Sequence, residues 1–109
     1  MKRWTLLLLL AAACGGASDH ERLGDKAYVD GDYVVAFQEY QAATRNHDEA
    51  ELWAKLGAAA LKSQKLTEAV AAYLKLAEAD KTRGSEAARG LEQVAALAAR
   101  DGGDIPLRQ

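Results

Sequence analysis

The sequence contains a single proline and few β-branched residues, which disfavours a β-sandwich or a β-barrel. It also contains a single cysteine, Cys14, so one chain can form neither an intramolecular disulfide nor a cysteine-based zinc site. Aromatic residues make up only 6% of the 109 residues, whereas 50% are apolar and alanine is abundant. This composition is typical of closely spaced helices and predicts one small all-α domain.

A strong excess of one charge and the common catalytic motifs are also absent. The net charge is −2, so the sequence has no basic footprint for nucleic acid and we expect no nucleic-acid partner. There is no phosphate-binding loop or dinucleotide fingerprint, and both histidines, His20 and His47, lie near expected helix ends. We therefore expect no enzymatic activity, no catalytic or metal-binding residue and no cofactor.

The first residues have the layout of a secretory signal peptide. A positive start, Met1-Lys2-Arg3, precedes an apolar run from Thr5 to Ala13 that ends in three alanines. The run is about half of the ~20 residues that a helix needs to span a bilayer, so a permanent transmembrane helix is not predicted. We predict instead that residues 1–13 are a signal peptide that is removed.

Cys14 follows this run directly, and Leu10-Ala11-Ala12-Ala13-Cys14 resembles the lipobox of bacterial lipoproteins, with Ala11 where leucine is usual. The resemblance implies that Cys14 becomes the first residue and carries fatty acyl chains, with residues 14–17 as the tether to the membrane. Gly15 replaces the aspartate that marks inner-membrane retention, which implies an outer-membrane protein facing the periplasm. Because the three alanines also satisfy conventional cleavage, a soluble periplasmic or secreted protein is the alternative.

The rest of the chain contains an internal repeat with a spacing of 33 residues. The repeat superposes Leu23-Gly24 on Leu56-Gly57, Ala27 on Ala60, Ala36 on Ala69, and Tyr40 on Tyr73. Trp53 precedes Leu56 by three residues, and the joint pattern resembles the signature of tetratricopeptide-repeat (TPR) proteins. The resemblance implies two TPR helix pairs, residues 18–48 and 49–81, in a short α-solenoid.

The repeated residue types have a physical reason. Gly24 and Gly57 lie within expected helices, where glycine costs about 1 kcal/mol relative to alanine, so a close approach of the partner helix must offset this cost. The predicted repeat-packing residues are Leu23, Gly24, Ala36, Tyr40, Trp53, Leu56, Gly57, Ala69 and Tyr73.

Capping and turn signals place the expected helices at 18–30, 33–46, 49–63, 66–80 and 85–100. Ser18 and Asp48 each precede a glutamate at capping-box spacing and are expected to cap helices. Gly31 can take a left-handed conformation between the first two helices, with Asp32 as the next cap, whereas the second copy has Gln64 at this turn and is expected to form it less well.

The C-terminal region extends the repeat by one helix only. Gly90 continues the 33-residue spacing from Gly57, but Gly102, Gly103 and Pro106 prevent a partner helix from following. Residues 85–100 are therefore predicted to be a capping helix, and residues 101–109 a flexible tail.

In TPR proteins the first helix of each pair lines a peptide groove. By this resemblance the candidate groove residues are Asp25, Tyr28, Val29, Lys55, Ala58, Leu61 and Lys62. Two other interpretations stay open: Leu61 can pack the capping helix onto the second repeat, and the charged residues can be solvated helix charges. The carboxylate clamp of chaperone-binding TPR proteins is not expected, because Glu21, Asp25, Gly84 and Ala88 occupy its basic or polar positions.

We therefore expect a membrane-tethered TPR protein–protein interaction module, an adaptor or scaffold in the bacterial cell envelope with one protein partner. The alternative is a self-associating structural lipoprotein whose repeat ends stack without a separate ligand. Two repeats and a cap are close to the lower size limit of a solenoid, so we expect a stability of only a few kcal/mol.

Overall fold

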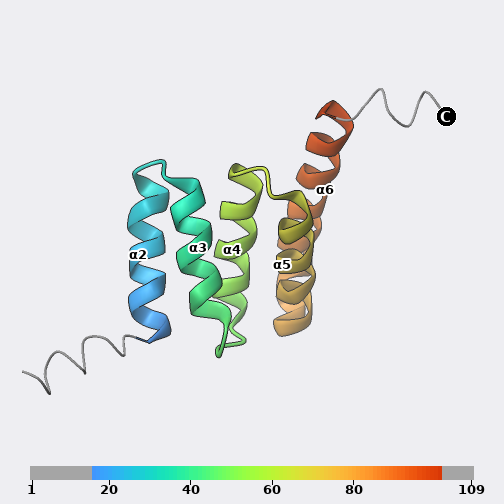
Figure 1. The fold of residues 1–109 in the computed structure, drawn as a ribbon. Coiled ribbons are helices and arrows are strands. Elements are labelled where there is room, and N and C mark those ends of the chain that lie inside the picture. Colours follow the sequence, from blue (N-terminus) through green and yellow to red (C-terminus); the bar gives the residue numbers. More distant parts are fainter. Residues whose placement is uncertain (1–15, 102–109) are drawn as a thin grey trace, which may run out of the picture.

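A computed structural model describes residues 16–101, which form an all-α fold of stacked helix hairpins (Figure 1). The described elements are α2 (Ala17–Val29), α3 (Tyr33–Thr44), α4 (Ala50–Lys62), α5 (Leu66–Ala79), the 3₁₀ helix η1 (Lys81–Arg83) and α6 (Gly84–Asp101). Helices α2 and α3 form the first hairpin, α4 and α5 form the second, and α6 packs against both helices of the second hairpin. The fold is the expected short α-solenoid of two helix pairs and a capping helix.

The expected helix bounds agree with the observed bounds to within two residues. The sequence analysis missed η1, a short turn that begins where the Asp80 carboxylate accepts a hydrogen bond from the backbone N–H of Thr82 at 3.0 Å. The predicted signal peptide, the predicted lipidation of Cys14 and the tail after Asp101 lie outside the described residues.

Each hairpin is built around a tyrosine that lies over a helix glycine. Tyr40 and Tyr73 are both buried. A Cβ atom built on Gly24 would lie 2.5 Å from Cε1 of Tyr40, and one built on Gly57 would lie 2.9 Å from Cζ of Tyr73. Any side chain at these glycines would therefore displace the ring, which explains why glycine occupies the middle of α2 and α4.

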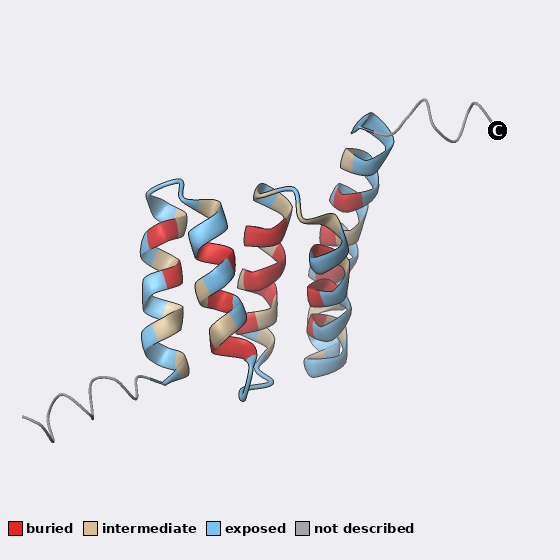
Figure 2. Cartoon of the chain, in the orientation of Figure 1, coloured by how far each residue is buried: buried red, intermediate tan, exposed pale blue. Residues whose placement is uncertain are grey.

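Alanines fill the remaining space between the helices. Ala36, Ala60 and Ala69 are completely buried, and Leu52 and Leu76 are the largest fully buried side chains. Figure 2 shows that the buried residues lie on the helix faces that are turned toward one another. Because these side chains are short, the helices approach closely, and each buried CH₂ group contributes about 0.8 kcal/mol to the stability.

Leu23 is the one predicted repeat-packing residue that the structure places on the surface. Its side chain is 41% exposed, whereas Leu56, its counterpart in the second copy, is 6% exposed. Leu56 lines a cleft together with Phe37 of the preceding hairpin. No hairpin precedes Leu23 within residues 16–101, so the same residue type has no helix to pack against, and the prediction of repeat contact at Leu23 was wrong. Trp53 is half-buried.

The two hairpin turns have the same backbone conformation. Gly31 has a φ angle of 84° and Gln64 has a φ angle of 61°, so both lie in the left-handed region. In the first turn the N–H of Asp32 donates to the Ala27 carbonyl at 2.8 Å, and in the second the N–H of Lys65 donates to the Ala60 carbonyl at 2.8 Å. The second turn is thus fully formed, contrary to expectation, although a left-handed conformation costs a non-glycine residue roughly 1–2 kcal/mol.

The expected side-chain caps are not formed. Helix α2 begins at Ala17, so Ser18 lies within it rather than in front of it. Glu49 is the N-cap residue of α4, and Asp48 instead accepts a hydrogen bond from the Trp53 indole N–H at 2.6 Å. Asp32 occupies the N-cap position of α3 but makes no side-chain cap hydrogen bond. Because the Asp48 carboxylate is hydrogen-bonded to the indole, it fixes the orientation of Trp53 instead of capping the helix.

Helix α6 keeps the glycine of the repeat but replaces three of its apolar residues. A Cβ atom on Gly90 would lie 2.3 Å from Cζ of Tyr73, so this ring lies between glycines of α4 and α6. At the 33-residue spacing, however, Trp53, Leu56 and Ala60 are followed by Glu86, Arg89 and Gln93. A polar outer face of this kind is typical of the terminal helix of a solenoid.

Candidate functional site

The predicted groove residues come from two helices: Asp25, Tyr28 and Val29 lie on α2, and Lys55, Ala58, Leu61 and Lys62 lie on α4. Ala54, Ala58 and Leu61 follow one another at helical spacing, so their side chains share a face. Two hollows open along this face, and together we call them the groove. The first, of about 310 Å³, is lined by Tyr28, Tyr40, Ala54, Lys55 and Ala58, and the second, of about 430 Å³, is lined by Leu61, Lys62, Gln64, Gln93, Ala96 and Leu97.

The structure thus brings five of the seven predicted groove residues to the groove. Asp25 lies beside the first hollow, where it contacts Tyr40 and Lys55. Val29 lines neither hollow and is 85% exposed. Leu61 is partly buried against the core, as the alternative interpretation allowed, and it also lines the second hollow.

A charged network borders the first hollow. The Tyr40 hydroxyl donates to Asp25 Oδ1 at 2.6 Å, and Lys55 Nζ donates to Asp25 Oδ2 at 3.1 Å and to Glu21 Oε2 at 2.7 Å. Asp25 and Glu21 come from α2, Tyr40 from α3 and Lys55 from α4, so the network joins the two hairpins. It therefore holds the walls of the hollow at a fixed separation.

Two members of the network, Tyr40 and Lys55, have raised pKa values. Burial and the hydrogen bond to Asp25 raise the pKa of Tyr40 well above its usual range. Burial alone would lower the pKa of Lys55, but the hydrogen bonds to Glu21 and Asp25 outweigh it and raise this pKa. Both groups therefore stay protonated at neutral pH, and the ammonium group of Lys55 is already satisfied by carboxylates within the chain.

An aromatic cluster near the first turn includes Tyr28 of the first hollow and lies beside Lys62 of the second. The rings of Tyr28 and Tyr33 have centroids 5.1 Å apart and meet edge to face at 70°. Lys62 Nζ lies 5.7 Å from the centroid of the Tyr33 ring, a cation–π geometry. Tyr33 is not among the predicted groove residues, because it starts α3 and the repeat pattern assigns groove contacts to the first helix of each pair.

Two ion pairs of Arg83 link α4 to the start of α6. Arg83 of η1 donates to Glu51 of α4 at 3.0 Å and to Glu86 of α6 at 2.8 Å. The hydrogen bonds to Glu86 and then Glu51 raise the pKa of the Arg83 guanidinium further above its usual range. The sequence analysis missed this contact, since Arg83 lies between the expected helices, outside the repeat pattern.

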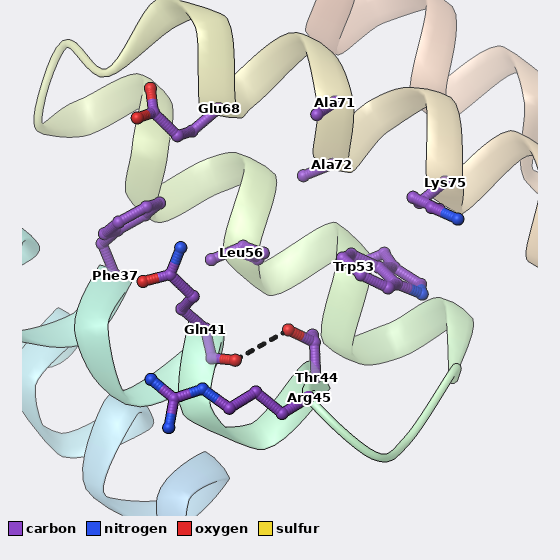
Figure 3. A pocket seen from close by; sticks show the side chains of 10 residues that line it. All are labelled: Phe37, Gln41, Thr44, Arg45, Trp53, Leu56, Glu68, Ala71, Ala72 and Lys75. Carbon is purple, nitrogen blue, oxygen red and sulfur yellow. Dashed lines mark hydrogen bonds between the residues drawn. The ribbon is translucent and has the colours of Figure 1, made fainter.

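A further cleft, which the sequence analysis also missed, opens between α3 and α5 with α4 as its floor (Figure 3). We call it the rear cleft. Its volume is about 620 Å³, and it is lined by Phe37, Gln41, Thr44, Arg45, Trp53, Leu56, Glu68, Ala71, Ala72 and Lys75. Leu56 is two residues from both Ala54 and Ala58, which at about 100° per residue places it on the opposite face of α4. The rear cleft and the groove therefore lie on opposite sides of the solenoid.

Within residues 16–101, His, Cys, Asp and Glu side chains nowhere gather in a group of three or more that could hold a metal ion. His20 Nδ1 lies 2.8 Å from Glu39 Oε1 and joins α2 to α3, a structural contact between the helices of one hairpin. None of the helices described is both long and apolar enough to cross a membrane.

In comparisons with known proteins, the chain matches no protein-family model, no curated protein and no solved structure. The resemblance to TPR proteins and to lipoproteins therefore rests on the residues of this chain alone.

Proposed function

We propose that the chain is a TPR-type interaction module that holds a segment of one other protein along the groove. The observation that carries the proposal is the pair of open hollows on one face of α4, with an alanine and leucine floor and Lys62 at the rim. An amphipathic helix or an extended segment with small apolar anchors fits such a surface. The paired charges around Lys55 act as a rigid frame and leave Lys62 as the cation that faces the partner.

Capture of partners from envelope fractions tests this proposal. The variant Ala58→Arg fills the first hollow with a long charged side chain, and Lys62→Glu reverses the charge at the second hollow. Glu78→Lys, at an exposed position that lines neither hollow, is the matched control for a charge change. We expect one protein to be captured by the wild type and by the control and to be lost from both groove variants, with helical circular dichroism unchanged. Identical sets of captured proteins for all four chains would refute the role of the groove.

We further propose that Cys14 anchors the module in the outer membrane of a bacterial envelope. The support is the order of a positive start, a short apolar run, three alanines and a cysteine in the first 14 residues. Two or more acyl chains would give stable membrane attachment, which a single chain does not. Intact mass of the protein isolated from membranes should show the added acyl groups on a chain that starts at Cys14. A chain that starts after Ala13 without added mass, in the soluble fraction, would show conventional cleavage.

Self-association at the first hairpin is the second candidate function, because one end of the solenoid is apolar and the other is polar. Leu56 and Glu68 both line the rear cleft, so their counterparts Leu23 and Val35 share the equivalent face of the first hairpin. Leu23 and Val35 are 41% and 45% exposed, whereas the opposite end presents polar residues of α6.

Such a surface would favour contact between the first hairpins of two copies rather than head-to-tail stacking. Sedimentation over a concentration series should then show dimers that Leu23→Glu removes and Lys62→Glu leaves unchanged. A monomer at every concentration would exclude this function and leave the groove proposal intact.

A further inference from the structure

The rear cleft has the size and the surface of a binding site. Its volume of about 620 Å³ exceeds that of either hollow of the groove and lies within the range of about 300–1,000 Å³ that is usual for ligand sites. Leu56 of α4 and Ala72 of α5 give the cleft an apolar lining, and the aromatic rings of Phe37 and Trp53 stand at either end of it (Figure 3).

The shape of the rear cleft fits a helix. Its walls run from Phe37 to Thr44 on α3 and from Glu68 to Lys75 on α5, and these two helices run in the same direction (Figure 1). Seven residues of a helix rise by about 10 Å, so each wall is about two helical turns long. The side chains of Ala71 and Ala72 are short, so the α5 wall projects little into the cleft and the backbone of a third helix can approach it. An apolar stripe of two turns on such a helix would cover the floor.

The charge of the rear cleft selects an acidic partner. Lys65 Nζ lies 5.4 Å from the centroid of the Phe37 ring, and Lys75 Nζ lies 6.0 Å from that of Trp53. Arg45 lies on the opposite wall, and none of the ion pairs within residues 16–101 includes Arg45 or Lys75. Glu68 is the only acidic residue among those that line the cleft. These cations are thus available, in contrast to Lys55 in the groove, which two carboxylates already bind.

We propose that the rear cleft is a second binding site, which takes an amphipathic helix of a partner protein whose apolar stripe is flanked by glutamate or aspartate. The apolar side chains displace water from Leu56, Ala72 and the two rings, and the carboxylates of the partner contact Arg45 and Lys75 on the two rims. The bound helix lies beside α3 and α5 and leaves the groove on the opposite face free. One chain then contacts two protein segments at once, as a scaffold does.

Fluorescence of Trp53 provides a direct readout. Trp4 and Trp53 are the two tryptophans, and Trp4 lies in the segment that we expect to be removed. In the full chain carrying Trp4→Phe, as in a chain that starts at Cys14, all tryptophan emission therefore comes from the rear cleft. The protein, in neutral detergent micelles, is titrated with a helical peptide that is acetylated and amidated at its ends. Its leucines recur alternately three and four residues apart, with glutamates between them. A second peptide carries glutamine in place of every glutamate. We expect saturable quenching or a blue shift with the first peptide and binding weaker by about tenfold or more with the second.

Two charge-reversal variants assign the site. We expect Arg45→Glu combined with Lys75→Glu to weaken binding of the acidic peptide by about tenfold or more, and Lys62→Glu in the groove to leave it unchanged. Equal binding of both peptides, or no saturable change in Trp53 emission, would overturn the proposal. Loss of acidic-peptide binding in the Lys62→Glu variant but not in the Arg45→Glu, Lys75→Glu variant would overturn it too. A response of Trp53 to phosphatidylglycerol vesicles but not to the acidic peptide would also overturn it, because the cleft would then contact lipid. Since the groove and the rear cleft are tested with different variants, failure of one leaves the other standing.

Discussion

Replacement of Gly90 by alanine tests the arrangement of α4, α5 and α6 most sharply. In a helix interior alanine is favoured over glycine by about 1 kcal/mol, so a free position would gain stability. At Gly90, however, the new Cβ would lie 2.3 Å from Cζ of Tyr73, and the ring would have to retreat to an ordinary contact of about 3.5 Å. The same ring faces Gly57 of α4, where a Cβ would already lie 2.9 Å away, so the retreat is blocked by a second helix.

The resulting destabilisation can be estimated from these distances. Overpacking of this kind costs typically about 1–3 kcal/mol, and the blocked retreat places Gly90→Ala near the upper value. After the gain in helix propensity, we expect a net loss of about 2 kcal/mol in the free energy of unfolding. In a domain of this size, such a loss lowers the melting temperature by roughly 10 °C.

Urea and thermal unfolding, followed by helical circular dichroism, measure this loss, and Gly84→Ala is the matched control. Nothing lies within 4 Å of a Cβ atom on Gly84, so alanine there should be neutral or slightly stabilising. In a Tyr73→Leu background, Gly90→Ala should cost much less than it does in the wild type, because the leucine side chain ends short of the clash. If Gly90→Ala is as stable as Gly84→Ala, the proposed contact between Tyr73 and α6 does not exist.

Three further predictions follow from the turns and the charged network. Because both turn positions have a left-handed backbone, Gln64→Gly should raise the free energy of unfolding by about 0.5 kcal/mol in urea denaturation, and Gly31→Ala should lower it by about 1 kcal/mol. Equal effects of the same sign would contradict the left-handed conformation of the two turns. Lys55→Met should cost about 0.5–1 kcal/mol in low salt, and the difference from wild type should shrink in high salt as the contacts with carboxylates are screened. Burial raises the pKa of Tyr40 and of Tyr73, so their contribution to stability is complete below the unfolded-state pKa of about 10 and is lost as the pH rises above it. Alkaline titration should therefore show tyrosinate absorbance rising together with the loss of helical circular dichroism. The stability of the Tyr40→Phe variant should be less sensitive to alkaline pH than that of the wild type.

The periodic part of the fold could be predicted from the sequence because its signals are local or strictly repeated. Alanine content and helical spacing indicate helices, and the 33-residue spacing places Gly57 and Tyr73 in the same relation as Gly24 and Tyr40. The capping boxes failed because a capping signal is short and competes with other partners, and the Asp48 carboxylate is bound by the Trp53 indole instead. The second turn formed without glycine because the hairpin on either side of Gln64 imposes its conformation.

The sites were predicted only where they follow the repeat. Ala58 and Leu61 lie on the groove face because helical spacing alone determines which α4 residues share it. The pairing of Lys55 with Glu21 could not be read from the sequence, since it depends on how far apart α2 and α4 lie. The rear cleft depends on three helices from two hairpins, so no spacing within one helix marks the residues that line it.

Site-specific photo-crosslinking at Ala58 tests most directly whether the groove holds another protein. A photoreactive side chain at position 58 faces the first hollow, and the same group at the exposed position 78 lines neither hollow of the groove. On irradiation of intact cells, we predict a single discrete adduct from position 58 that Lys62→Glu abolishes, and none from position 78. An adduct with the mass of two copies of this chain would show self-association instead. No adduct at position 58, or the same adducts at both positions, would contradict the groove as a protein-binding site.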